Sequence, residues 1–203
     1  MRLEQYKIGV RLIASFGIVL AMLLSISVFA LFQMGSLAEL TSKLHKHPYT
    51  VTAATLEIQG HITAMHRSMK DVALATSLEA IDNAAKDVDA HEQEALAAFG
   101  VALERFLGDK KDIEAARQLF LSWQPIRNEV ILLSREGDKE AAALVTKQKG
   151  ASLVADLSKR VEAISQFARA KAGEFMTNAE ATRGTATALM LAAAVVALVV
   201  SAA

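Results

Sequence analysis

The feature that most constrains this chain is an uncharged apolar run of 21 residues, Leu12 to Phe32, whose only polar side chains are three serines. A helix rises about 1.5 Å per residue, so the run matches a membrane hydrocarbon core of about 30 Å. A cleaved signal peptide has a shorter apolar core, roughly 7–15 residues, and small residues at its cleavage site. Here the run ends in the bulky sequence Phe32-Gln33-Met34. We therefore predict a retained transmembrane helix over residues 12–32.

A second uncharged apolar run of 20 residues, Gly184 to Ala203, ends the sequence. Its length predicts a second transmembrane helix over residues 184–203, and its many small residues would let helices pack closely in lipid. A spanning helix is usually followed by an anchoring Lys or Arg, and none follows here. We expect the chain to be a fragment whose cytoplasmic continuation is missing; the alternative is a complete small membrane protein.

The charges before the first run predict its orientation. Arg2, Lys7 and Arg11 stand against a single acidic residue, Glu4. Because cytoplasmic flanks of membrane helices carry an excess of Lys and Arg, residues 1–11 are predicted to lie in the cytoplasm. Residues 33–183 would then form a domain on the outer face of the membrane.

Composition narrows the function classes. The net charge is zero and no basic stripe stands out, which argues against nucleic-acid binding. The sequence has no cysteine and no Gly-rich phosphate loop, metalloprotease motif or catalytic triad pattern, so we expect neither a cofactor nor enzymatic activity. With only 10 Gly and 2 Pro among 203 residues, long helices are favoured throughout.

Four helical segments are predicted between the two apolar runs. The signals that divide them are a capping box at Thr76 and Glu79 and stop-and-start pairs at Gly108-Asp109 and Gly137-Asp138. Pro48 lies within the first segment and Pro125 within the third, where each is expected to kink or break the helix. The segments, 33–75, 77–107, 109–136 and 138–183, are 43, 31, 28 and 46 residues long. Short connections force antiparallel neighbours, and the two longest rods would reach the membrane. The fold class predicted is all-α, an antiparallel up-down four-helix bundle flanked by two transmembrane helices.

Apolar residues mark the face that each segment is predicted to bury. In the fourth segment we expect this face to include Leu144, Leu153, Leu157 and Val161. In the first segment Val51, Ile58, Met65 and Val72 share one heptad position. The other position is interrupted by two polar residues, and we expect this to weaken the packing and make it adjustable. The interrupted position consists of Ala54, His61, Ser68 and Ala75.

The stretch His61 to Asp71 (HITAMHRSMKD) is the most unusual polar cluster. Arg67 and Asp71, and likewise His66 and Lys70, are four residues apart and can meet on one helix face. Ordinary surface pairing is one interpretation. The other is a site for a small polar or anionic ligand, with Arg67 and Lys70 as donors. The predicted ligand-binding residues are His61, His66, Arg67, Lys70, Asp71 and Arg127, the last of which would point from the third segment into a distal pocket between helices.

A metal site is a weaker hypothesis. His61, Met65 and Met69 recur every four residues, and His with Met suits copper(I). Methionine is, however, a common core filler, and His61 and His66 are five apart, which does not place two ligands side by side on a helix. We predict no metal ligands from this pattern.

Two features of the chain resemble a known family. One is the pair of spans that bracket an outer helical bundle, and the other is a set of three local sequences. These are His47-Pro48-Tyr49-Thr50-Val51, Met65-His66-Arg67-Ser68-Met69-Lys70-Asp71, and Trp123-Gln124-Pro125-Ile126-Arg127 followed by Gly137. The chain resembles the four-helix-bundle sensor domain of bacterial methyl-accepting chemotaxis proteins, which also serves sensor histidine kinases and diguanylate cyclases.

The resemblance implies a receptor of the bacterial inner membrane, with its bundle in the periplasm and a homodimeric state. A small ligand would bind the bundle, and a helix shift would pass through the lipid membrane to a cytoplasmic output module. Two alternatives stay open: an anchored bundle that binds a partner protein, and a periplasmic sensor of copper or zinc.

Overall fold

A computed structural model describes residues 8–202, which are helical almost throughout and contain no strand. These residues divide into two compact units, residues 44–172 and a second unit formed by residues up to 43 with those from 173 onward. We describe each unit by itself.

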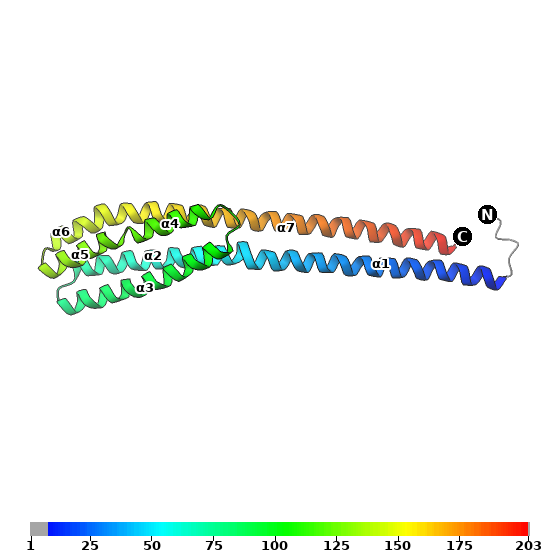
Figure 1. Ribbon diagram of the computed structural model, residues 1–203, viewed down its shortest axis with the longest axis horizontal. Helices are drawn as coiled ribbons and strands as arrows, with labels where there is room; N and C mark the ends of the chain where they lie inside the picture. The colour runs from blue at the N-terminus through cyan, green and yellow to red at the C-terminus, as the bar shows by residue number, and fades with distance from the viewer. Residues whose placement is uncertain (1–7, 203) are drawn as a thin grey trace. The chain divides into compact units, whose positions relative to one another are not determined.

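Residues 44–172 form an antiparallel up-down four-helix bundle (Figure 1). The first two rods are α2 (Thr50–Leu74), preceded by the π-helical turn η2 (His45–Tyr49), and α3 (Leu78–Arg105). The third rod is divided into α4 (Lys110–Leu121) and α5 (Gln124–Glu136). The fourth consists of α6 (Lys139–Val145), the π-helical turn η3 (Thr146–Gly150) and the first part of α7 (Ala151–Ala202). The predicted fold class is confirmed.

Side-chain caps explain where α3, α4 and α6 begin. Asp109 accepts a hydrogen bond from the Lys111 amide at 3.0 Å, and Asp138 accepts one from the Ala141 amide at 3.0 Å. The cap of α3 is Ser77, whose Oγ accepts from the Ala80 amide at 3.2 Å. The capping box predicted at Thr76 is therefore wrong by one residue: with Ser77 as the cap, Glu79 falls one position too early to reach back.

Helix ends and irregularities follow the Gly and Pro positions. Gly137 ends α5 with a φ of +86°, a left-handed conformation that a residue with a Cβ adopts only with strain. Pro125 lies in the first turn of α5, where its missing amide hydrogen leaves no helical bond unmade. Pro48 lies inside η2, so the predicted irregularity there takes the form of a widened π turn.

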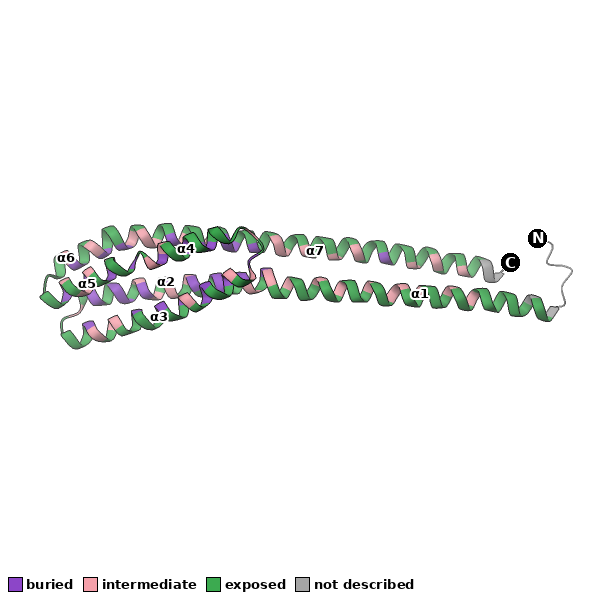
Figure 2. Cartoon of the chain, in the orientation of Figure 1, coloured by how far each residue is buried: buried purple, intermediate pink, exposed green. Residues whose placement is uncertain are grey.

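The bundle core consists of the inward faces of the four rods, drawn in purple in Figure 2. The predicted heptad position of α2 is fully buried, and at the interrupted position Ser68 is buried while His61 stays half-buried. Leu144, predicted to be part of the fourth seam, is 52% exposed. Leu144 and Leu153 are nine residues apart, which is two and a half turns of an α-helix, so even a regular helix would place them on opposite faces.

The unit outside the bundle contains the two apolar runs. Residues 8–43 belong to α1 (Ile8–Leu44), and residues 173–202 belong to α7. Both helices are long and apolar enough to cross a membrane. Most of the large apolar side chains of the first run are exposed, for example Ile13 at 75%, Phe16 at 72% and Phe32 at 76%, and α1 is accordingly drawn mainly in green in Figure 2. Such a surface is suited to lipid, because none of the described residues covers it. The charges that predict the orientation, Arg2, Glu4 and Lys7, lie outside the described residues.

Candidate functional site

The predicted ligand-binding residues do not form one cluster. His66 and Lys70 line a pocket, Arg127 lies in the core, and His61 faces α3. Arg67 and Asp71 are exposed, and no ion pair between them is found in the part of the chain that the structure describes. Ligand binding by this set stays a prediction, and only His66 and Lys70 lie together in a cavity.

The pocket lies near the end of the bundle that holds the α2–α3 and α5–α6 connections. Its volume is about 290 Å³. Its lining is formed by residues of α2, α6, η3 and α7: His66, Lys70, Ala73, Leu74, Ala143, Thr146, Lys147 and Ala151. The wall is thus mainly apolar and carries two cationic side chains. An apolar cavity with a few polar groups is typical of a small-molecule site.

Lys147 is the charged residue of this pocket that no sequence pattern indicated. It lies in η3, 77 positions from Lys70, and no local pattern connects the two lysines. Both side chains are exposed, so each is free to turn toward a bound anion. The Thr146 hydroxyl beside it is occupied, because it donates to the Ala142 carbonyl at 2.9 Å. The pocket therefore suits a compound with an apolar body and a negative charge.

His66 is the half-buried polar residue of the pocket. Its Nε2 is buried and has no hydrogen-bond partner among the described residues. The ring meets Trp123 edge-on, with 6.4 Å between the ring centroids. Burial, and after it the positive charge of Lys70, lowers the pKa of His66 below its ordinary value of 6.5. His66 is therefore mainly neutral at pH 7.

The lowered pKa of His66 predicts that acidification destabilises the bundle. The unfolded chain protonates this histidine near its ordinary value, whereas the folded chain resists protonation until the pH reaches the lowered value. The unfolded state therefore binds more protons, and stability falls as the pH drops through about 6.5 toward the lowered pKa. We expect a His66→Gln variant to lose less stability than the wild type on this change.

This difference is measured by urea unfolding of the two proteins at about pH 8 and about pH 5.5, on either side of the ordinary histidine value. A His45→Gln variant, at an exposed position, controls for the loss of an imidazole as such. If His66→Gln and the wild type lost the same free energy of unfolding, the prediction would be wrong.

Arg127 was predicted to point into a distal pocket between helices, but it lies in the core instead. Its side chain is 3% exposed and forms an ion pair with Glu92 of α3, which is 11% exposed. The guanidinium also lies over the Trp123 ring, 5.7 Å from the centroid. An arginine whose charge is already neutralised in the core is a structural contact between α3 and α5. The sequence signal that could have found it is Glu92, a carboxylate within an otherwise apolar seam.

The fold defines the class of the protein: an all-α, up-down bundle flanked in sequence by two apolar helices. The chain belongs to the family described as the four helix bundle sensory module for signal transduction, whose model matches residues 5–183. The match includes the first apolar run and the whole bundle. Neither the curated proteins nor the solved structures contain a match to this chain.

Proposed function

We propose that this chain is the sensing part of a transmembrane receptor of the bacterial inner membrane. Its N-terminus lies in the cytoplasm, residues 12–32 and 184–203 span the membrane, and residues 33–183 form the periplasmic sensor. The receptor acts as a homodimer and passes a signal to a cytoplasmic output module. Two observations support this proposal. The family is a sensory module for signal transduction and not a catalytic one. The chain also has two helices long and apolar enough to cross a membrane.

The observation that carries the proposal is the composition of the pocket wall. His66 and Lys70 belong to α2, which follows the first apolar helix, and Ala151 begins α7, which continues as one helix to Ala202. A ligand in this pocket touches both rods at once. Binding would therefore favour one packing of α2 against α7 over another.

The π turn η3 offers a place for this change. Two of its residues, Thr146 and Lys147, line the pocket, together with Ala143 of the preceding helix α6. π turns depart from the regular helical hydrogen-bond pattern and are frequent at functional sites. A small rearrangement there would displace α7 along or about its axis, which is the motion a receptor needs to signal through a membrane helix.

We expect a small apolar carboxylate to bind this pocket. The test is calorimetric titration of butyrate, hexanoate and benzoate into the full chain in lipid nanodiscs, with empty nanodiscs as the blank. Replacing one charged partner of an anion by a neutral one removes about 1.5 kcal/mol, which is roughly tenfold in affinity. Lys70→Gln and Lys147→Gln should each weaken binding by about this factor.

The matched control is Lys86→Gln, an exposed lysine of α3 outside the pocket, which should bind as the wild type does. Hexylamine, which has the same apolar body as hexanoate and the opposite charge, should not bind. Binding of the amine as tightly as the acid, or equal affinities in all three lysine variants, would show that this pocket is not an anion site.

A further inference from the structure

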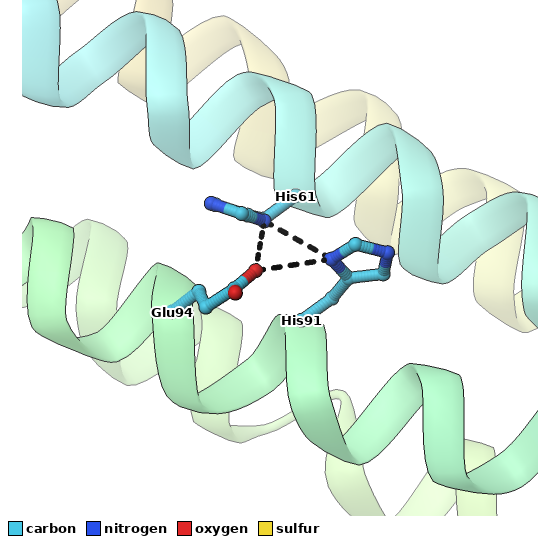
Figure 3. Close-up of side chains that lie close together, drawn as sticks. All are labelled: His61, His91 and Glu94. Atoms are coloured by element: carbon cyan, nitrogen blue, oxygen red, sulfur yellow. Dashed lines mark hydrogen bonds and ion pairs between the residues drawn. The ribbon is translucent and has the colours of Figure 1, made fainter.

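His61, His91 and Glu94 form a second polar cluster, on the α2–α3 side of the bundle. Figure 3 shows His61 from α2 pointing at His91 and Glu94, which are one turn apart on α3. The His61 Nδ1 lies 3.2 Å from the His91 Nδ1 and 3.2 Å from a Glu94 carboxylate oxygen. The His91 Nδ1 lies 3.4 Å from the same oxygen. Three atoms with lone pairs thus converge on one point.

Hydrogen bonds alone do not satisfy this arrangement. A carboxylate carries no hydrogen, and a neutral imidazole carries one N–H. If both Nδ1 atoms are protonated, both can donate to Glu94, but the two N–H groups then crowd each other. If only one Nδ1 is protonated, the lone pair of the other Nδ1 faces a lone pair of the Glu94 carboxylate oxygen, and the two repel each other. A cation at the centre accepts all three lone pairs at once.

The distances between the three atoms fit one particular cation. Zinc binds imidazole nitrogen at about 2.0–2.1 Å and carboxylate oxygen at about 2.0–2.2 Å in a tetrahedron. Two ligands of a tetrahedron with these bond lengths are about 3.3–3.5 Å apart. The observed separations, 3.2, 3.2 and 3.4 Å, are close to these edges. Copper(II) and nickel(II) favour tetragonal or square-planar sites instead.

The surroundings allow a metal to enter and the fold to keep its shape. The side chains of His61, His91 and Glu94 are 23%, 33% and 60% exposed, so the cluster opens to solvent. All three residues lie within regular helix, which holds the ligands in register. Met65 and Met69, the thioethers of the copper hypothesis, are core side chains, 0% and 2% exposed. The ligand set is therefore two imidazoles and one carboxylate.

We propose that His61, His91 and Glu94 bind a zinc ion, with the fourth position open to water or to an exogenous ligand. The ion links α2 to α3. Because a ligand that binds only the folded state stabilises it, zinc increases the stability of the bundle as its concentration rises above the dissociation constant. The site is separate from the pocket of His66, Lys70 and Lys147, so either can fail without the other.

The experiment is calorimetric titration of zinc chloride into the full chain in nanodiscs, purified without a polyhistidine tag and treated with a chelator beforehand. We expect one zinc per chain. His61→Ala and His91→Ala should each weaken binding at least a hundredfold, and Glu94→Gln at least tenfold. His45→Gln, which removes an exposed histidine outside the cluster, should leave the affinity unchanged.

Cobalt(II) gives an independent readout of the geometry, because tetrahedral cobalt absorbs visible light far more strongly than octahedral cobalt. The wild type should show the intense tetrahedral bands and His61→Ala should lose them, while helical circular dichroism confirms that both proteins are folded. Zinc affinity that is equal in the wild type and in both histidine variants would overturn the proposal. So would the absence of saturable binding at micromolar zinc.

Discussion

Replacing Arg127 with methionine is expected to destabilise the bundle by about 3–5 kcal/mol, a large part of the stability of a domain of this size. The loss comes mainly from Glu92, whose carboxylate stays in the core without a counter-charge when the guanidinium is gone. The measurement is urea unfolding of the full chain in detergent micelles, followed by the fluorescence of Trp123 and by circular dichroism. Trp123 is the sole tryptophan and is 1% exposed, so its emission reports on the core.

The double variant Arg127→Met/Glu92→Met separates two explanations of that loss. Replacing a whole buried ion pair by apolar side chains is often neutral or stabilising. We therefore expect the double variant to recover most of the free energy of unfolding that the single variant loses. If it recovered none, the loss would come from the packing of Arg127 against Trp123 and not from the buried charge.

The chain also offers a matched exposed pair. Arg135 contacts Asp82 at 2.7 Å with both side chains about half exposed, at 51% and 49%. Because exposed ion pairs contribute about 0–1 kcal/mol, Arg135→Met should change stability little. Equal losses in Arg127→Met and Arg135→Met would contradict the assignment of Arg127 to a buried pair.

Local sequence signals were enough to predict the architecture. Asp109, Asp138 and Gly137 act through bonds to residues a few positions away, so these three helix boundaries follow from the nearby sequence. The heptad pattern of α2 likewise depends only on helical geometry. The prediction for Leu144 was wrong because its nine-residue separation from Leu153 is not a helical repeat.

The contacts between rods could not be predicted in the same way. Arg127 and Glu92 are 35 positions apart, and His61 and His91 are 30 apart. Whether two such residues meet depends on how far one helix is displaced along its neighbour, which a single sequence does not specify. The sequence alone indicates that the stretch from His61 to Asp71 is unusually polar. It does not indicate that His61 meets His91 or that His66 meets Trp123.

A receptor of the proposed kind displays its bundle outside the cytoplasm, and single cysteines test this directly because the sequence has none of its own. Lys86→Cys and Lys111→Cys place a thiol at exposed positions of α3 and α4, and Gln5→Cys places one before the first apolar run. The full chain is produced in a bacterium and treated with a small maleimide that does not cross the inner membrane. The positive-inside rule predicts opposite labelling of the two regions.

We expect both bundle thiols to react in intact cells and the thiol at position 5 to react only after lysis. Labelling of Cys at position 5 in intact cells, with the bundle thiols protected until lysis, would contradict the account.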